Sequence, residues 1–425
     1  MAKQYNKPWR YALAMLGTSI AGTMYQSYGT YFYTDKLFLP LSAIAVGNIF
    51  FAVWDAFNDP IAGVMSDRTR TKWGRRKPWL MAAIPAYTLF SILFFNPPRA
   101  LGVGAALAAY FTVTMMLTET AGTITNVNYH SLLPELFRDT RERNRANSIR
   151  QALQLVGMII GVSLVPTLAG ALGYPQTALL LGVISCAALL YAISGCRERQ
   201  DFQNTPQPGL VESLKSLASN RGFWFVSVSH FFYQACSGLL LAGIPFFIKY
   251  SLGLPDSSAT FLSASVFVMA IPAMAVWYRA INRFGALAAW RAALIWLGLS
   301  LVPMYFARSL VPACVVGAFV GVGIAGVTAN LDMINSELIE ADARKHGVRR
   351  EATFFAGISF VTRVSSLART GVFFMLSAIF GFVSGSNPGA NPAMASRYMM
   401  VVFPICLMAF SVAASMFARF DGERG

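Results

Sequence analysis

The chain has 425 residues, of which 56% are hydrophobic and only 12% are charged. Soluble proteins carry about a quarter charged residues, so the composition excludes a soluble domain and indicates an integral membrane protein. The net charge of +15 does not indicate nucleic-acid binding, because Lys and Arg lie in short gaps between apolar runs and form no continuous basic face.

The apolar runs predict an all-α membrane protein. Backbone groups in hydrocarbon must be satisfied within the chain, which allows only helices or a closed barrel. The runs are too long and too continuously apolar for the alternating strands of a barrel. A spanning helix needs about 20 apolar residues. By this measure the chain contains twelve predicted transmembrane helices, at 11–33, 41–65, 79–97, 101–127, 149–171, 174–195, 222–248, 258–279, 286–307, 310–335, 353–383 and 395–418.

The connections between these helices alternate in basic content. Isolated charges such as Lys36 and Lys249 fall on one side of the membrane. The other side receives the N-terminal basic residues and the clusters at 68–77, 138–145, 197–221 and 344–350. Because basic connections stay in the cytoplasm, we expect both termini to be cytoplasmic. The expected location is a bacterial inner membrane or a plasma membrane.

The longest polar stretch, 197–221, lies at the middle of the chain. It separates an N-terminal half, 1–196, from a C-terminal half, 222–425, and each half contains six predicted helices. A six-plus-six plan is typical of transporters built from repeats, which bind their substrate near the midplane of the membrane.

The second predicted helix carries the densest group of polar residues, Asp55, Asn58 and Asp59, followed by Pro60. The i,i+4 spacing places both carboxylates on one helix face. Oxygen ligands suit a hard cation such as Na⁺, so Asp55 and Asp59 are candidate metal ligands. Two nearby carboxylates also suit a proton, because their repulsion favours protonation of one. Asp59 could instead cap the basic connection or pair with a Lys.

A recognisable pattern follows in SDRTRTKWGRRKPW, after Gly63. It resembles the signature loop of the major facilitator superfamily. Together with the preceding DAFNDP, it resembles the glycoside–pentoside–hexuronide:cation symporter family of that superfamily. Further similar segments occur in order along the chain, at 31–35, 133–150, 332–337 and 349–355.

This resemblance implies a twelve-helix fold, cation-coupled symport and a monomer. It implies that Thr123 completes the cation site of Asp55, Asn58 and Asp59 as a hydroxyl ligand. It places Arg363 where the family has a central Lys, although Arg363 could also be a charge that reaches toward the membrane surface. It implies a gating role, holding neighbouring helices in one state, for Gly63, Asp67, Arg68, Arg75 and Arg76.

The expected substrate site departs from the galactoside carriers of the family. Ser19, Asn126 and His130 stand where those carriers have two carboxylates and a Trp, while Arg150 matches the family's Arg. The other candidate substrate ligands are Trp54, Glu119, Arg363 and Arg369. Arginines can bind an anionic group through charge-assisted hydrogen bonds. Glu119 could instead be a proton site or the partner of an Arg, and His130 could simply be a satisfied hydrogen-bonding residue.

Other classes of function find little support in the residues. The chain has three His and no phosphate-binding loop, nucleophile elbow or HExxH motif, so we do not expect an enzyme. Its five Cys have no paired spacing, and no cofactor beyond the coupling Na⁺ or H⁺ is expected. The sequence therefore predicts a cation symporter for a glycoside-like or anionic small molecule. The alternative is a transporter of an amphiphile such as a lysolipid, with or without cation coupling.

Overall fold

The computed structural model describes residues 7–137, 140–198, 220–346 and 351–418. In these residues the regular elements are helical, apart from an isolated β-bridge between Ser384 and Asn387. The chain forms two compact units. Unit 1 comprises Met1–Pro206 and Val383–Asn387, and unit 2 comprises Gln207–Phe382 and Pro388–Gly425.

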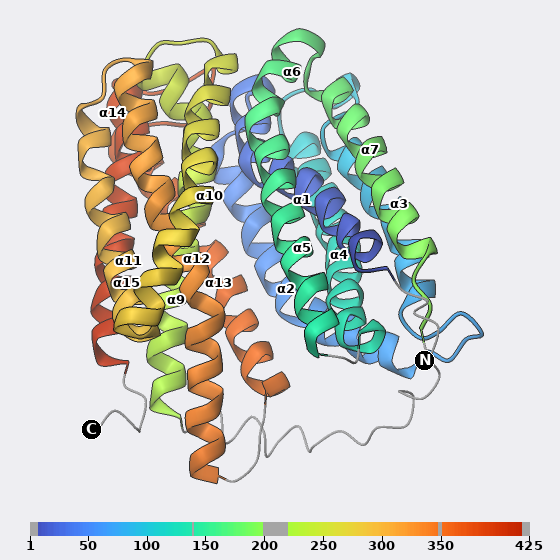
Figure 1. Cartoon of the computed structure of the whole chain (residues 1–425). Helices are drawn as coiled ribbons and strands as arrows, with labels where there is room; N and C mark the ends of the chain where they lie inside the picture. The colour runs from blue at the N-terminus through green and yellow to red at the C-terminus, as the bar shows by residue number, and fades with distance from the viewer. Residues whose placement is uncertain (1–6, 138–139, 199–219, 347–350, 419–425) are drawn as a thin grey trace. The chain divides into compact units, whose positions relative to one another are not determined.

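The described residues of unit 1 form seven α-helices, joined by shorter π-helical and 3₁₀ segments (Figure 1). In chain order these elements are α1 (Pro8–Tyr31), η1 (Phe32–Lys36), α2 (Leu41–Arg68), α3 (Lys77–Phe94), η2 (Arg99–Leu101), α4 (Ala105–Leu136), α5 (Thr140–Ile159), η3 (Ile160–Leu164), α6 (Val165–Leu172) and α7 (Tyr174–Ser194). The segments α5, η3 and α6 follow one another without a break.

Unit 2 has the same kind of organisation (Figure 1). Its elements are α9 (Arg221–Phe246), η5 (Phe247–Ser251), η6 (Asp256–Ser258), α10 (Ala259–Phe284), α11 (Ala286–Ser300), η7 (Val302–Phe306), α12 (Leu310–His346), α13 (Glu351–Phe380), α14 (Pro392–Arg397), η8 (Tyr398–Val402) and α15 (Phe403–Phe417). The segments α14, η8 and α15 are continuous, like α5, η3 and α6.

The two units pair their helices in the same way. In unit 1, α1 packs on α5 and α7, α2 packs on α4, and α3 packs on α4 and α7. In unit 2, α9 packs on α13 and α15, α10 packs on α12, and α11 packs on α12 and α15. The same five pairings in the same chain order indicate an internal structural repeat, as in transporters built from repeated halves.

Glycines allow the closest of these packings. A Cβ on Gly157 would lie 2.7 Å from the carbonyl oxygen of Leu16, and one on Gly161 would lie 2.6 Å from that of Ile20. The four-residue spacing places both glycines on one face, where α5 and η3 meet the backbone of α1. Small residues at this spacing let helices in a membrane approach closely, which replaces the hydrophobic driving force that lipid cannot supply.

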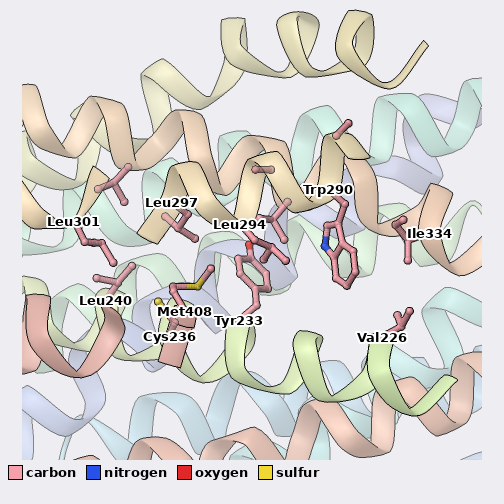
Figure 2. Packing of buried hydrophobic residues seen from close by; sticks show 14 of the residues in the cluster. Val226, Tyr233, Cys236, Leu240, Trp290, Leu294, Leu297, Leu301, Ile334 and Met408 are labelled. Atoms are coloured by element: carbon pink, nitrogen blue, oxygen red, sulfur yellow. The ribbon is translucent and has the colours of Figure 1, made fainter. Parts of the chain in front are cut away.

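The core of unit 2 is a cluster of buried apolar side chains that come from α9, α10, α11, α12, α13 and α15 and from the segments next to them. Figure 2 shows Trp290 and the leucines that follow it on α11 directed toward side chains of α9, with Met408 of α15 among them. The α11 positions are spaced three and four residues apart, so they form one helix face. These residues are Trp290, Leu294 and Leu297 of α11 and Leu301 directly after it, and they face Val226, Tyr233, Cys236 and Leu240.

Nine helical stretches of the described residues are long and apolar enough to cross a membrane. They comprise all or most of α3, α5 with η3 and α6, α7, α9, α10, α11, α12, α13, and α14 with η8 and α15. The helix α2 contributes a shorter apolar segment, Leu41–Asp55. The structure therefore supports a polytopic all-α membrane protein.

We predict that Gly161→Val destabilises unit 1, because the added side chain overlaps the α1 backbone. Overpacking of this kind costs roughly 1–3 kcal/mol. Thermal unfolding of the purified protein should show a lower midpoint. The control is Gly170→Val on α6, where a Cβ meets nothing within 4 Å. Equal midpoints for the two variants would contradict the close-packing argument.

Candidate functional site

The residues of the predicted cation site lie on α2 and α4, which pack against each other. The indole Nε1 of Trp54 donates a hydrogen bond of 2.8 Å to Thr120 Oγ1. About two turns earlier on α2, a Cβ on Gly47 would lie 2.7 Å from Thr112 Oγ1. The helices therefore run parallel, with partners offset by 65 (112 − 47) and 66 residues. This register places the stretch from Asp55 to Asn58 level with the turn of α4 that contains Thr123.

Asp55, Asn58 and Thr123 are all buried, with exposed fractions of 6%, 4% and 3%. Among the described residues, the buried Nδ2 of Asn58 has no hydrogen-bond partner. The two ends of an amide are interchangeable by a flip, which would place the Asn58 oxygen at this position. Oxygen atoms of these three types are the ligands that Na⁺-like hard cations prefer.

The second carboxylate of the predicted site, Asp59, lies on α2, but its side chain is outside the described residues. Among the residues whose side chains are described, no group of three or more His, Cys, Asp or Glu is arranged to hold a metal ion. The pairing of Asp55 with Asp59 therefore stays a prediction. Trp54, the neighbour of Asp55, is 41% exposed, and its role in binding a solute stays a prediction.

Glu119 lies on the side of α4 that faces α3. It interacts electrostatically with the phenol of Tyr87 on α3. One turn further, a Cβ on Gly122 would lie 3.2 Å from the Tyr87 ring. Thr120, in contrast, faces α2. Glu119 therefore has a place near Tyr87 that the sequence alone did not indicate.

Arg150 and His130 form a direct contact between α5 and α4. The guanidinium Nη1 of Arg150 lies 2.7 Å from His130 Nδ1. Because a guanidinium can only donate, Nδ1 accepts and the imidazole proton lies on Nε2. Asn126 lies one turn from His130 on the same exposed face of α4. These three residues therefore present mainly hydrogen-bond donors together, as expected for a polar solute site.

A pair of tyrosines fixes this region of α4 to α1. Tyr11 donates to the carbonyl of Tyr129 at 3.0 Å, and Tyr129 donates to the carbonyl of Tyr11 at 3.1 Å. Their rings stack at 4.6 Å. The next residue is His130, so the reciprocal bonds hold the backbone that carries the imidazole.

The other predicted substrate residues lie elsewhere in the two units. Ser19 is buried, and its Cβ lies against Gly157 at the contact of α1 with α5. This position gives Ser19 a packing role, and only its hydroxyl could serve a solute. In unit 2, Arg363 and Arg369 are half-buried on α13, and the Arg369 guanidinium packs over Gly238 of α9.

The predicted gating residues form a charged network at the ends of α2, α3 and α4. Arg75 Nη2 lies 2.6 Å from Glu135 Oε1, and Arg76 Nε lies 3.6 Å from the same oxygen. Arg76 also donates to Ser66 Oγ at 2.6 Å. Arg68 is exposed at the end of α2.

Two further gating residues contribute no described contact to this network. The side chain of Asp67 lies outside the described residues. A Cβ on Gly63 would meet nothing within 4 Å, so its neighbours do not require a glycine there.

Sequence reasoning missed Glu198, which organises this network. Its carboxylate accepts hydrogen bonds from the backbone N–H groups of Arg75 at 2.7 Å, Arg76 at 3.1 Å and Lys77 at 2.6 Å. A carboxylate at a helix N-terminus satisfies unpaired N–H groups and complements the helix dipole. The only available signal was an acidic residue directly after the sixth apolar run, within a basic connection.

Basic side chains cap the C-terminus of α7, which lies close to the N-terminus of α3. Lys77 Nζ donates to the carbonyls of Ser194 and Cys196, each at 3.0 Å. Arg10 donates to the carbonyl of Tyr191 at 3.1 Å. Burial raises the pKa of the Cys196 thiol to about 12, so this cysteine stays neutral among the charges.

We predict that Glu198→Ala lowers the thermal stability of the purified protein by about 1–3 kcal/mol, because three N–H groups lose their acceptor. The matched control is Glu340→Ala, an exposed acid on α12. A thermal-unfolding midpoint unchanged in Glu198→Ala relative to Glu340→Ala would contradict the capping role.

Comparisons with known proteins agree with this architecture. A family model described as MFS/sugar transport protein matches residues 10–421. An isoprimeverose transporter of Lactiplantibacillus pentosus is 26% identical, over 97% of this chain and 89% of its own length. A sodium-dependent lysophosphatidylcholine symporter of Danio rerio is 23% identical, over 87% of this chain and 77% of its own length.

Solved structures show the same fold. A bacterial homologue of the human lysosomal transporter Spinster superposes with a TM-score of 0.71 at 13% identity, covering 98% of this chain and 97% of the other. The apolar helices and bacterial relatives, which include a glycoside/cation symporter of Escherichia coli that is 28% identical over 58% of this chain and 55% of its own length, place the chain in the bacterial inner membrane as a multi-pass protein. The chain belongs to the sugar-transport family of the major facilitator superfamily, within its glycoside–pentoside–hexuronide:cation symporter branch, and it is a membrane transporter and not an enzyme.

Proposed function

We propose that this protein is a cation-coupled symporter of a glycoside-like or anionic organic solute, working by alternating access. The observation that supports this function best is the buried set of carboxylate, amide and hydroxyl groups where α2 packs against α4. Ionisable groups inside a membrane protein are costly, so their presence favours an ion-coupling role. The coupling ion and the solute would be the partners of a monomer in the bilayer.

We further propose that α1, α2 and α4 also span the membrane, which gives twelve spans in two six-helix halves with cytoplasmic termini. These helices fall outside the nine apolar stretches. They are also the helices that carry Ser19, Asp55 and Asn126. Polar functional residues lower the hydropathy of a helix, and such residues in spanning helices face the protein interior.

The coupling follows from the charges on α2. When both Asp55 and Asp59 are ionised and close together, they repel each other, and a bound Na⁺ or H⁺ relieves this repulsion. A solute that binds better to the neutralised site gains affinity, and by linkage it raises the affinity for the cation equally. The oxygen ligands and the sodium-dependent relative favour Na⁺, while a carboxylate pair also suits H⁺.

The solute class rests on the polar groups of both units. The isoprimeverose transporter supports a sugar-like solute. The contact of Arg150 with His130, and the half-buried Arg363 and Arg369, favour a solute with acceptor oxygens or a negative group. The lysophosphatidylcholine symporter supports the alternative of an amphiphilic solute.

We predict that Asp59→Cys abolishes ion-driven accumulation of solute, because the variant cannot form the carboxylate pair. The measurement is uptake of isoprimeverose, a glucuronide and a lysolipid into proteoliposomes, each under a Na⁺ gradient and under a pH gradient. Asp256→Asn, in the connection before α10, is the control. Full active uptake by Asp59→Cys would remove Asp59 from the cation site.

We predict that Arg369→Gln removes any preference for an anionic solute over its neutral analogue. The measurement is the Kd of methyl glucuronide and of methyl glucoside by thermal shift. Loss of a charge-assisted contact should weaken the anion about tenfold, or 1.4 kcal/mol. Arg283→Gln, exposed at the end of α10, is the control. An unchanged anion preference would exclude Arg369 as its source.

A further inference from the structure

A short turn, Val383–Asn387, belongs to unit 1, although the chain before and after it belongs to unit 2. It closes on itself through hydrogen bonds among its own residues. Val383 N donates to Asn387 O at 3.0 Å, Asn387 N donates to Ser384 O at 3.0 Å, and the hydroxyls of Ser384 and Ser386 lie 2.8 Å apart. This turn, here called the strap, is therefore a compact piece of backbone that can move as one body.

The strap binds the corner of unit 1 where η1 ends and α2 begins. The backbone N–H of Leu41, the first residue of α2, donates to Val383 O at 2.8 Å. The N–H of Gly385 donates to Thr34 O, also at 2.8 Å. Pro40 at the N-cap of α2 makes no capping hydrogen bond, so the strap satisfies a helix-terminal N–H that no side chain caps.

Gly385 is held at this corner by close contact. A Cβ at this position would lie 2.7 Å from Asp35 Cα and 2.8 Å from Asp35 O. These are backbone atoms of a residue that is only 2% exposed, so they cannot move aside cheaply. Only a glycine lets the two backbones approach this closely. The docked strap therefore requires Gly385.

The ends of the strap are adapted for a change of direction. Gly381 and Gly389 flank it with φ of 64° and 77°, values that favour glycine. Phe382 lies between Gly381 and the strap. Its ring packs edge-on against the rings of Phe246 and Tyr250 of unit 2, with centroid distances of 5.9 and 5.6 Å. The chain thus leaves an aromatic anchor in unit 2 and enters unit 1 at the very next residue.

The docking corner also stores strain. Phe38, between η1 and α2, has a φ of 58°, in the left-handed region that non-glycine residues rarely adopt. Such a conformation persists only where the surrounding structure holds it. The strap bonds to both sides of this residue, at Thr34 and at Leu41, and so contributes to holding it.

We propose that the strap is a reversible latch, which docks on the η1–α2 corner in one state of the transport cycle and releases when that end of the solute path opens. Alternating access moves one repeat against the other. A segment that contacts unit 1 but is joined on both sides to unit 2 must release or deform during such a movement. The inference rests on alternating access from the proposed function, but not on any particular solute or cation.

The test compares Gly385→Val with Asn387→Val in the purified full-length protein, without added solute. The control variant is Asn387→Val: Asn387 is exposed in the same turn and bonds to the strap through its backbone N and O, so the substitution leaves the bonds of the strap in place. The measurement is backbone hydrogen–deuterium exchange of the peptide 37–44. Release of the strap in Gly385→Val should speed exchange at the Leu41 amide at least about tenfold, while peptides of α3 stay unchanged.

A second measurement reports on the movement itself. Spin labels at Arg99→Cys in unit 1 and Arg308→Cys in unit 2, with the native cysteines replaced, give the distance between the connections that follow α3 and η7. The latch predicts that Gly385→Val increases the population of longer distances at least threefold over Asn387→Val. Faster exchange with an unchanged distance distribution would reduce the strap to a helix cap and overturn the latch.

Equal exchange in the two valine variants would also overturn the proposal. If Gly385→Val loses protection from exchange throughout unit 1, the unit has unfolded, and Gly385→Ala is then measured in its place. Faster exchange at Leu41 together with longer distances in Gly385→Ala supports the latch. Wild-type exchange and distances reject it. None of these readouts uses solute or cation. Failure of cation-coupled uptake therefore leaves this test intact, and failure of the latch leaves the symport proposal intact.

Discussion

In hydrocarbon, each peptide N–H and C=O must find its partner inside the protein, and the rest of this structure depends on that constraint. Helices satisfy it everywhere except at their ends. Charged side chains satisfy several of these ends: Glu198 accepts from three N–H groups at the start of α3, and Lys77 donates to carbonyls at the end of α7. In unit 2, Arg291 of α11 donates to Ser415 O and Ala418 O at the end of α15. The two units therefore use corresponding helices to satisfy corresponding helix ends.

Lipid gives no hydrophobic reason for helices to associate, so contact must come from close packing and from polar bonds between helices. Gly157 and Gly161 allow close packing against α1. The hydrogen bond of Trp54 with Thr120 is a polar bond between α2 and α4. The candidate cation site lies beside this second contact. The register of α2 against α4 thus brings Asp55 and Asn58 to the level of Thr123. The same register therefore sets both the packing of the two helices and the geometry of the candidate site.

The helices themselves could be predicted well, because hydropathy and helix length are local properties. The predicted helix at 79–97 corresponds to Lys77–Phe94. Errors arose where a helix continues beyond the apolar part: the prediction at 310–335 missed the polar end of Leu310–His346, and the one at 149–171 missed the first turns of Thr140–Ile159. The site was predicted less completely. Ser19 lies in a helix contact, and Glu198 was missed because its partners are backbone groups more than 120 residues earlier in the chain.

The sequence by itself determined that the protein lies in a membrane, that it is helical, roughly where its helices lie and which family it belongs to. Each of these depends on composition or on short ordered motifs. Only the tertiary structure decided which polar residues meet. It paired Arg150 with His130, turned Glu119 toward Tyr87 and docked Gly385 against Asp35. The physical reason is that such contacts depend on the register and rotation of packed helices. These are set by the shapes of whole faces and by glycines that admit a neighbouring backbone, and no short stretch of sequence contains that information.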